Sequence, residues 1–206
     1  MRRKSKNIHR GVGVKKFLPG LFSRHDQSLR QAFGAKGGTN PLFRRTFADD
    51  EPICVILGDN TTDADIRPAV ENFTGGATIF LKEVPDPHRF GCPVFAGDDP
   101  ARVVEIQEKP RNPRSPYAVT GLYIYDPHVF DHIAGLEPSE RGEFEITDVN
   151  NCYLREGQLH WHELDGFWSD AGTFESLYRT TRYWAEKKLG KHTADRVAAG
   201  LFASTP

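Results

Sequence analysis

The 206-residue sequence has little cysteine, no long apolar run and almost no net charge. Its three cysteines, Cys54, Cys92 and Cys152, are far apart and form no CxxC pair, which argues against a disulfide framework and a zinc knuckle. No stretch approaches the roughly 18 apolar residues of a membrane span. The net charge of −1 gives the whole chain no bias towards nucleic acid. We therefore expect a soluble, cytoplasmic protein with neither a membrane nor a nucleic-acid partner.

The small net charge conceals a basic N-terminus. The first 25 residues carry eight Lys or Arg and no acid, whereas the rest carries 19 basic against 28 acidic residues. This start lacks the apolar core of a signal peptide, because Lys15 and Lys16 interrupt it and the run FLPGLF is short. A targeting peptide and a nucleic-acid-binding arm are alternatives. We favour a basic, poorly ordered or degenerate segment over residues 1–46.

The rest of the chain has the pattern of an α/β protein. The continuous β-branched run ICVIL, residues 53–57, is typical of a strand buried on both faces of a parallel sheet. Further strands are expected at residues 77–84, 92–95, 103–107, 119–125 and 158–164, and helices at 66–73, 127–134, 145–156 and 173–189. This alternation predicts a three-layer α/β/α domain with a largely parallel sheet over residues 47–190, followed by a tail over 191–206. Ligands of such sheets bind beyond the carboxyl ends of the strands.

Two aspartates follow strand-like segments and precede expected helices. Asp59 ends ICVILGD, and Asp170 lies in GFWSDAGTFES. Carboxylates at two strand ends can share one hard cation such as Mg²⁺, with water and phosphate oxygens as further ligands. The competing interpretation is structural, with Asp59 as a turn residue and Asp170 as a helix cap. Spacing alone leaves both interpretations open.

A second group of charges stands at the end of the strand expected at 103–107. A carboxylate such as Glu108 accepts hydrogen bonds from neighbouring sugar hydroxyls, and the ammonium of Lys109 suits a phosphate. Arg141, in PSERGEFEITD, offers a planar fork for a second phosphate contact. Each of these charges alone is more often a solvated surface residue.

Five motifs in one order turn these features into a resemblance. VILGDN, DPHRFG, EKPRNPRSPYAVTGLYIYD, RGEFEITDVNN and GFWSDAGTFES resemble the sugar-1-phosphate nucleotidylyltransferases, most closely those of the glucose-1-phosphate thymidylyltransferase type. The resemblance runs from about Phe47 to Leu189. It implies a Rossmann-like nucleotidyltransferase fold, often in a homo-oligomer. The implied reaction is nucleotidylyl transfer from a nucleoside triphosphate, dTTP in this type, to glucose-1-phosphate, giving dTDP-glucose and pyrophosphate.

The resemblance also implies roles for particular residues. Asp59 and Asp170 would bind Mg²⁺, and Lys109 and Arg141 would bind the sugar phosphate. The sugar pocket would be lined by Gly91, Glu108, Val119 and Tyr123, with Gly91 and Val119 contributing backbone groups.

The chain departs from the family pattern at its start. It contains neither the glycine-rich GGxGTRL loop, whose amides and arginine hold the triphosphate, nor the SKxLLP segment. We therefore expect an N-terminally truncated sheet without its first strands, an intact sugar-phosphate half, and doubtful activity of this chain alone. A non-catalytic sugar-phosphate-binding or subunit-interaction protein is the alternative. A metal-dependent glycosyltransferase is a third hypothesis, against which RGEFEITDVNN and GFWSDAGT speak.

Two histidine pairs have spacings that suit a metal. His128 and His132 are four apart on an expected helix, and His160 and His162 are two apart on an expected strand. No third ligand stands near either pair in the sequence, so we assign neither pair to a metal site.

Overall fold

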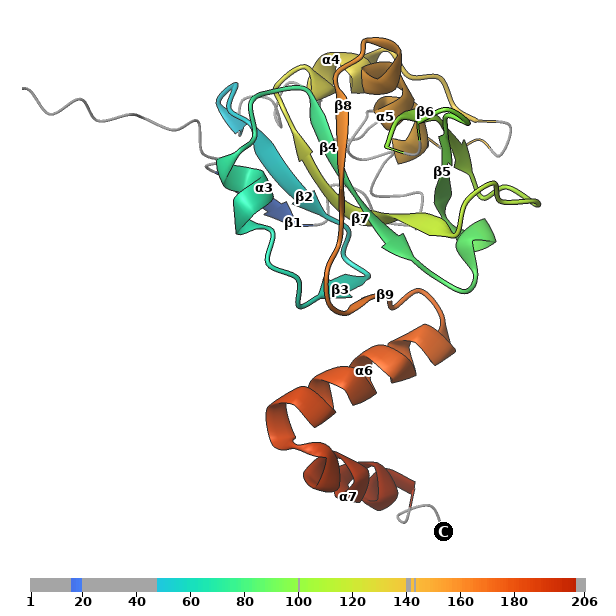
Figure 1. Ribbon diagram of the computed structural model, residues 1–206. Coiled ribbons are helices and arrows are strands. Elements are labelled where there is room, and N and C mark those ends of the chain that lie inside the picture. Colours follow the sequence, from blue (N-terminus) through green and yellow to red (C-terminus); the bar gives the residue numbers. More distant parts are fainter. Residues whose placement is uncertain (1–15, 20–47, 100, 140–141, 143, 203–206) are drawn as a thin grey trace, which may run out of the picture. The chain divides into compact units, whose positions relative to one another are not determined.

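The computed structural model describes residues 16–19, 48–99, 101–139, 142 and 144–202, which divide into two compact units. Unit 1 contains residues 16–19, 48–58 and 65–165 of this set, and unit 2 contains residues 59–64 and 166–202. Each unit has its own sheet and helices (Figure 1). Among the described residues, no helix combines the length and the apolar character that crossing a membrane requires.

The centre of unit 1 is a five-stranded sheet with the order β1-β2-β7-β4-β8 (Figure 1). Its strands are β1 (Lys16–Pro19), β2 (Ile53–Ile56), β4 (Ala77–Glu83), β7 (Tyr117–Tyr125) and β8 (Leu159–Glu163). β1 pairs parallel with β2, and β4 pairs parallel with β8. The central strand β7 runs antiparallel to both β2 and β4.

This architecture confirms the α/β class, but the sheet is mixed. A parallel return to the sheet needs a crossover, usually through a helix. Between β4 and β7 the described chain contains the 3₁₀ turn η1 (Pro87–Arg89) and two short strands, and no α-helix. These strands, β5 (Gly91–Phe95) and β6 (Val103–Glu108), pair antiparallel as a separate two-stranded sheet. The chain therefore returns as the antiparallel strand β7.

Helices α4 (Val129–Ala134) and α5 (Ile146–Arg155) pack on the central sheet of unit 1. The short helix α3 (Arg67–Glu71) has no buried residue. Side chains of α4 and α5 share one hydrophobic core with the sheet, formed by Ile53, Val55, Ala77, Ile79, Leu81, Tyr123, Tyr125, Val129, Phe130, Ile133, Val149 and Tyr153 among others. Burial of this apolar surface is the main stabilising contribution to unit 1.

Tyrosines connect this core to α5. The ring of Tyr125 stacks on Tyr153 with 5.8 Å between centroids, and its hydroxyl donates to Asn150 Oδ1 at 2.6 Å. Tyr153 donates in turn to Asp126 Oδ1 at 2.8 Å. Because a buried hydroxyl without a partner is costly, these two bonds allow large rings to fill the core. They fix α5 against the sheet.

The N-terminal part differs in one respect from the expectation that no strand precedes residue 53. Lys16–Pro19 form β1, and Lys16 is the partner of Ile53 in a parallel ladder. The edge of β2 is therefore paired over four residues. The rest of the segment 1–46, and also Arg141, lie outside the described residues.

Unit 2 contains a two-stranded sheet and two helices. Its elements are β3 (Asn60–Thr62), β9 (Trp168–Asp170), α6 (Phe174–Leu189) and α7 (Lys191–Phe202). A capping box starts α6: Ser176 N donates to Thr173 Oγ1 at 3.1 Å and Thr173 N to Ser176 Oγ at 3.0 Å. In place of a plain tail after residue 190, the chain forms α7.

Candidate functional site

In unit 1, the end of the β5–β6 pair carries the charged residues noted in the sequence. Gly91 lies opposite Glu108 in the ladder, and the next amide, Lys109 N, donates to Phe90 O at 3.0 Å. Lys109 has a φ of 43°, in the left-handed region that side chains with a Cβ rarely adopt. Such backbone strain is concentrated at functional sites. The strand end is therefore held in a specific, unfavourable conformation.

The Glu108 carboxylate has a partner on each oxygen. Lys109 Nζ lies 3.1 Å from Oε1, and Thr147 Oγ1 donates to Oε2 at 2.6 Å. The side chains of Glu108 and Lys109 remain 24% and 39% exposed, so a ligand can reach both groups. The pair offers an acceptor for hydroxyls next to a cation for an anion.

Helix α5 places Thr147 at this carboxylate. One turn further on, Asn151 Nδ2 donates to Ile106 O at 2.9 Å, and Asn151 Oδ1 accepts from Ile106 N at 3.1 Å. Residues four apart on a helix share a face, as do residues two apart on a strand. The two-bond contact at Ile106 therefore sets α5 against β6 so that Thr147 reaches Glu108. This contact stabilises the position of Thr147 next to Glu108.

Gly91 lies in close approach to Thr147 at the same place. A Cβ added to Gly91 would lie 3.1 Å from Thr147 Oγ1 and 3.6 Å from the Cβ of Val119. Four of the residues proposed to bind sugar phosphate, Gly91, Glu108, Lys109 and Val119, thus lie on adjoining elements of unit 1. Thr147 belongs with them.

Tyr123 is placed differently. It lies four residues beyond Val119 on β7, its side chain is 2% exposed, and its ring stacks on Tyr125 at 5.6 Å. Tyr123 is a core residue in this structure, and its assignment to the sugar pocket stays a prediction.

The sequence alone did not indicate a functional role for Thr147 or for its neighbour Asp148. Burial, followed by the nearby charge of Glu108, raises the pKa of the Asp148 carboxyl. Both residues lie in RGEFEITDVNN, one of the motifs that carry the resemblance. Their position inside this motif was the feature of the sequence that could have indicated a functional role. In the structure both residues lie in the first turn of α5.

The two candidate metal ligands lie together in unit 2. β3 and β9 pair antiparallel with Asn60 opposite Asp170, and Ala171 N donates to Asp59 O at 2.6 Å. Asp59 and Asp170 are therefore at the same end of the two-stranded sheet. Asp170 is 1% exposed. The structural alternative for Asp170 is wrong, because Thr173 rather than Asp170 caps α6.

Asn60 orients this end of the sheet. Its Nδ2 donates to Asp59 Oδ1 at 2.9 Å, and its Oδ1 accepts from Trp168 Nε1 at 2.8 Å. One amide thus fixes the Asp59 carboxylate and the Trp168 indole together. The sequence did not single out Trp168, because its pattern shows only an aromatic strand residue.

The carboxylate pair suits a hard divalent cation. Mg²⁺ prefers oxygen ligands and is usually held by one or two carboxylates, with waters and substrate phosphates completing an octahedron. Asp59, directly before β3, and Asp170, at the end of β9, could supply two such carboxylates. Within the described ranges, no group of three or more His, Cys, Asp or Glu side chains has a metal-binding arrangement, so protein ligands beyond this pair are not found there.

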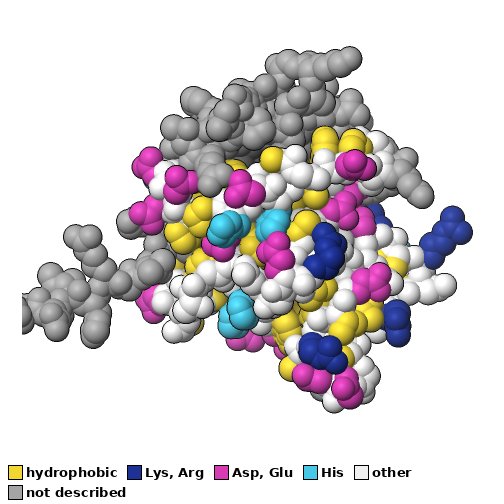
Figure 2. All heavy atoms as spheres, turned by 90° about the horizontal axis from the view of Figure 1, so that it is seen from above, with side chains coloured by type: hydrophobic (Ala, Val, Ile, Leu, Met, Phe, Trp, Pro, Cys, Tyr) yellow, Lys and Arg dark blue, Asp and Glu magenta, His cyan; other side chains and the backbone are white. Residues whose placement is uncertain are grey.

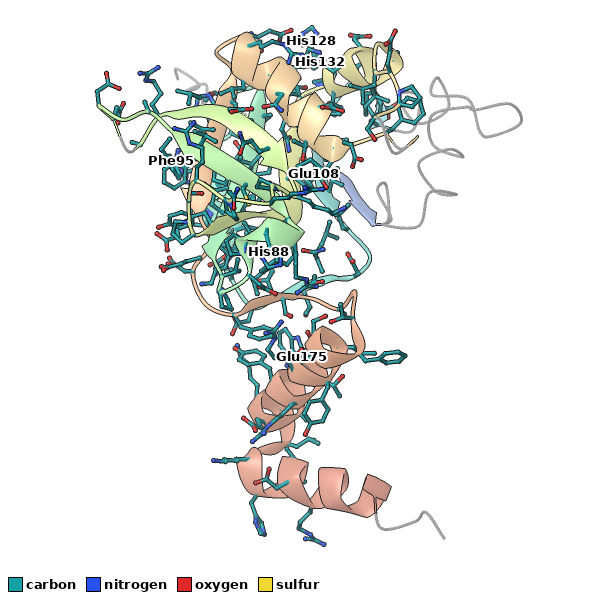
Figure 3. All side chains as sticks on the ribbon, turned by 90° about the vertical axis from the view of Figure 1, so that its right-hand side faces the viewer. His88, Phe95, Glu108, His128, His132 and Glu175 are labelled. Atoms are coloured by element: carbon teal, nitrogen blue, oxygen red, sulfur yellow. The ribbon has the colours of Figure 1, made fainter. Side chains whose placement is uncertain are left out.

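The two histidine pairs, His128 with His132 and His160 with His162, lie in unit 1. Histidine side chains are visible among acidic ones on the face in Figure 2, and His128 and His160 both line a groove of about 340 Å³. His132 packs edge-on against Tyr153 with 4.5 Å between ring centroids (Figure 3 labels His128 and His132). Nothing in these contacts assigns the histidines to a ligand.

A mixed α/β sheet of this kind is the fold of the nucleotidyltransferases. The chain belongs to the nucleotidyl transferase family, whose model matches residues 41–187. This family membership decides against the glycosyltransferase hypothesis.

Relatives of known name agree with this class. The chain is 40% identical over 183 residues to the glucose-1-phosphate thymidylyltransferase of Xanthomonas campestris pv. campestris, covering 77% of this chain and 61% of that protein. It is 36% identical to the low-salt glycan biosynthesis nucleotidyltransferase Agl11 of Haloferax volcanii, covering 70% of this chain and 41% of that protein. The chain thus spans 61% and 41% of the length of these two relatives.

Solved structures agree as well. A Bacillus anthracis protein described as a glucose-1-phosphate thymidylyltransferase, crystallised with sucrose, matches with a TM-score of 0.62 and 41% identity over 81% of this chain and 60% of that one. A UDP-glucose pyrophosphorylase complexed with UDP-glucose matches with a TM-score of 0.61 at 19% identity, over 71% of this chain and 61% of that one. The second match supports the fold alone.

Proposed function

We propose that this chain takes part in nucleotidylyl transfer from a nucleoside triphosphate to glucose-1-phosphate, with dTTP as the nucleotide and dTDP-glucose and pyrophosphate as products. The observation that carries the proposal is the Glu108–Lys109 strand end, with its paired carboxylate, exposed ammonium and left-handed backbone. Family membership and the relatives named glucose-1-phosphate thymidylyltransferase support the reaction class.

In this proposal the strand end binds the acceptor substrate. Thr147 and Lys109 hold the Glu108 carboxylate in place, where it accepts hydrogen bonds from the sugar hydroxyls. The Lys109 ammonium binds the sugar phosphate as a compact charge, with Arg141 as a second contact. Gly91 and Val119 contribute backbone groups, and the missing Cβ of Gly91 leaves room for the Thr147 hydroxyl that binds Glu108. Tyr123 would support this pocket from β7.

The carboxylate pair of unit 2 is the proposed Mg²⁺ site. When bound, Mg²⁺ neutralises phosphate charge and orients the triphosphate. Asp59 and Asp170 would hold it, and Asn60 fixes the Asp59 carboxylate through its side-chain amide. The reaction itself is attack of a sugar-phosphate oxygen on the α-phosphorus, with pyrophosphate leaving. Such a reaction depends on positioning and charge neutralisation rather than on a covalent role for a side chain.

A second candidate function follows from the sequence of the chain. It contains no GGxGTRL loop, and one lost donor at a comparable preorganised site costs roughly a hundred- to a thousandfold in rate. A non-catalytic sugar-phosphate-binding or subunit-interaction protein derived from the enzyme is therefore the alternative. We expect these 206 residues alone to bind glucose-1-phosphate and to turn over dTTP very slowly.

The test is a pyrophosphate-release assay on a monodisperse preparation with glucose-1-phosphate, dTTP and Mg²⁺, comparing the parent with Asp170→Asn. Slow release that Asp170→Asn removes supports the enzyme. Release equal to the Asp170→Asn background, with glucose-1-phosphate still bound in calorimetry, supports the non-catalytic alternative. A parent rate of about one per second or more, ordinary for an enzyme, would show that the chain builds a triphosphate site from other residues.

The proposal includes a reducing, cytoplasmic setting. Cys54, Cys92 and Cys152 are all free in the structure, and the first two are buried. Buried thiols in such positions act as small hydrophobic residues.

A further inference from the structure

The strand that follows Asp59 presents two different faces. Successive side chains of a strand alternate, so Asn60 and Thr62 share one face while Thr61 and Asp63 share the other. The first face holds the contact between Asn60 and Trp168 described above. The second face carries Thr61 and Asp63, and both of these polar side chains contact α6.

Asp63 is the centre of these contacts. Its Oδ1 accepts from Phe167 N at 2.7 Å, which closes the β3–β9 pair at the end opposite Asp59. Its Oδ2 accepts from Lys187 Nζ and from Tyr183 Oη, both on α6. Lys187 and then Tyr183 hold the pKa of the Asp63 carboxyl well below its usual range, so the group is charged. Only 14% of the Asp63 side chain is exposed.

Aromatic contacts extend this attachment. Trp184 Nε1 donates to Thr61 Oγ1 at 2.7 Å, so both residues of the second face bind α6. The ring of Tyr183 stacks on Phe167 with 3.7 Å between centroids and 6° between planes. Both strands of the pair are therefore tied to α6 within unit 2.

Apolar burial contributes little else to this attachment. The fully buried residues of α6 are the polar Ser176 and Thr180. The apolar side chains Phe174, Leu177 and Tyr178 are 94%, 48% and 54% exposed. Within unit 2, the polar contacts of Asp63 and Thr61 therefore act together with the Tyr183–Phe167 stack to connect the helix to the strand pair.

We propose that Asp63, held by Lys187 and Tyr183, is a positioning residue that keeps β3 in register with β9 and so keeps Asp59 and Asp170 together as a divalent-cation site. This inference rests on the proposed function, which assigns the cation to those two aspartates. Three residues of β3 separate Asp63 from Asp59, and Ala171 N binds Asp59 O only while the register is kept. Loss of the Asp63 contacts would therefore also weaken the pairing at the other end of the two strands, where Asp59 and Asp170 lie.

The test measures Mn²⁺ binding to the full 206-residue chain by electron paramagnetic resonance, with manganese chloride as the probe. The variants are Asp63→Asn, Lys187→Met, Lys187→Arg and Asp170→Asn. Lys188→Met is the matched control, because it removes the same charge from the neighbouring, exposed position of α6. A thermal melt of each variant records folding separately.

We expect Asp63→Asn and Lys187→Met each to weaken Mn²⁺ binding about tenfold, the lower end of what partners of metal ligands contribute, and to broaden the bound-Mn²⁺ spectrum. Lys187→Arg should restore affinity and spectrum, and Lys188→Met should match the parent. Asp63→Asn and Lys187→Met with parental Mn²⁺ affinity, whatever their melting temperatures, overturn the positioning role while leaving the proposed function intact. Equal weakening in Lys188→Met also overturns it. Parental binding by Asp170→Asn overturns both the metal pair and this inference.

Discussion

Replacing Lys109 by Met tests the sugar-phosphate strand end directly. The change removes the ammonium, keeps most of the apolar stem and retains a Cβ, so the strained left-handed backbone at this residue is the same in both proteins. The ion pair with Glu108 spans 3.1 Å, but Lys109 is 39% exposed. Such partly exposed pairs contribute at most about 1 kcal/mol to folding. We therefore expect the variant to fold.

The effect on binding should be larger than the effect on folding. A hydrogen bond to a charged group contributes about 1.5–3 kcal/mol. Because Lys109 is partly solvated, we expect the lower part of this range, which corresponds to about a tenfold increase in the Kd for glucose-1-phosphate. The loss should be small for free glucose, which has no phosphate to bind.

The assay is isothermal titration calorimetry with glucose-1-phosphate and with glucose. Arg111→Met is the matched control, since Arg111 is an exposed cation two residues further along the same loop. Equal affinity for glucose-1-phosphate in Lys109→Met and the parent would remove Lys109 from the site. An equal loss in Arg111→Met would show a general charge effect instead.

Three further changes have defined outcomes. Gly91→Ala places a Cβ 3.1 Å from Thr147 Oγ1; it should weaken glucose-1-phosphate binding, and calorimetry showing parental affinity would refute the close approach. The pKa of the Asp63 carboxyl is lowered in the folded chain, so its ionised form stabilises the fold above about pH 4, the pKa of an unfolded Asp, and this stabilisation is lost as the pH falls. In urea titrations below pH 4, the free energy of unfolding should therefore fall less in Asp63→Asn than in the parent. An equal fall in both proteins would contradict this. Burial raises the pKa of Cys92 to about 11, so iodoacetamide at pH 8 should modify it only after unfolding, and rapid labelling in the folded chain would contradict its burial.

Local pattern was enough to predict most of the longer strands and helices. The β-branched run of β2 reflects burial, which the sequence shows directly. The helical spacing in the sequence also predicted α6, although Phe174 and Leu177 of this helix are exposed. The antiparallel direction of β7 was not expected, although the lack of a helix between β4 and β7 was the relevant signal. Strand β3 was not predicted, because the sequence Asn-Thr-Thr shows no alternation of apolar and polar residues. In the structure this strand is held by its ladder with β9 and by the bond from Trp184 to Thr61.

The site was predictable in part. Glu108 and Lys109 stand out because charge at the end of a buried strand is unusual, and the structure adds a left-handed Lys109 to that signal. The contact of Thr147 with Glu108 joins residues 39 positions apart, so it depends on how α5 lies against β6. The sequence left helix capping open as the alternative role of Asp170, whereas Thr173 and Ser176 in GTFES form the cap of α6.

The most direct test of the proposed function is a crystal structure of the chain soaked with glucose-1-phosphate. We expect the phosphate to lie within hydrogen-bond distance of Lys109 Nζ and the sugar hydroxyls to donate to the Glu108 carboxylate. The sugar ring should lie beside the backbone of Gly91 and Val119. Glucose-1-phosphate bound elsewhere, for example in the groove lined by His128 and His160, with the Glu108–Lys109 pair unchanged, would contradict it.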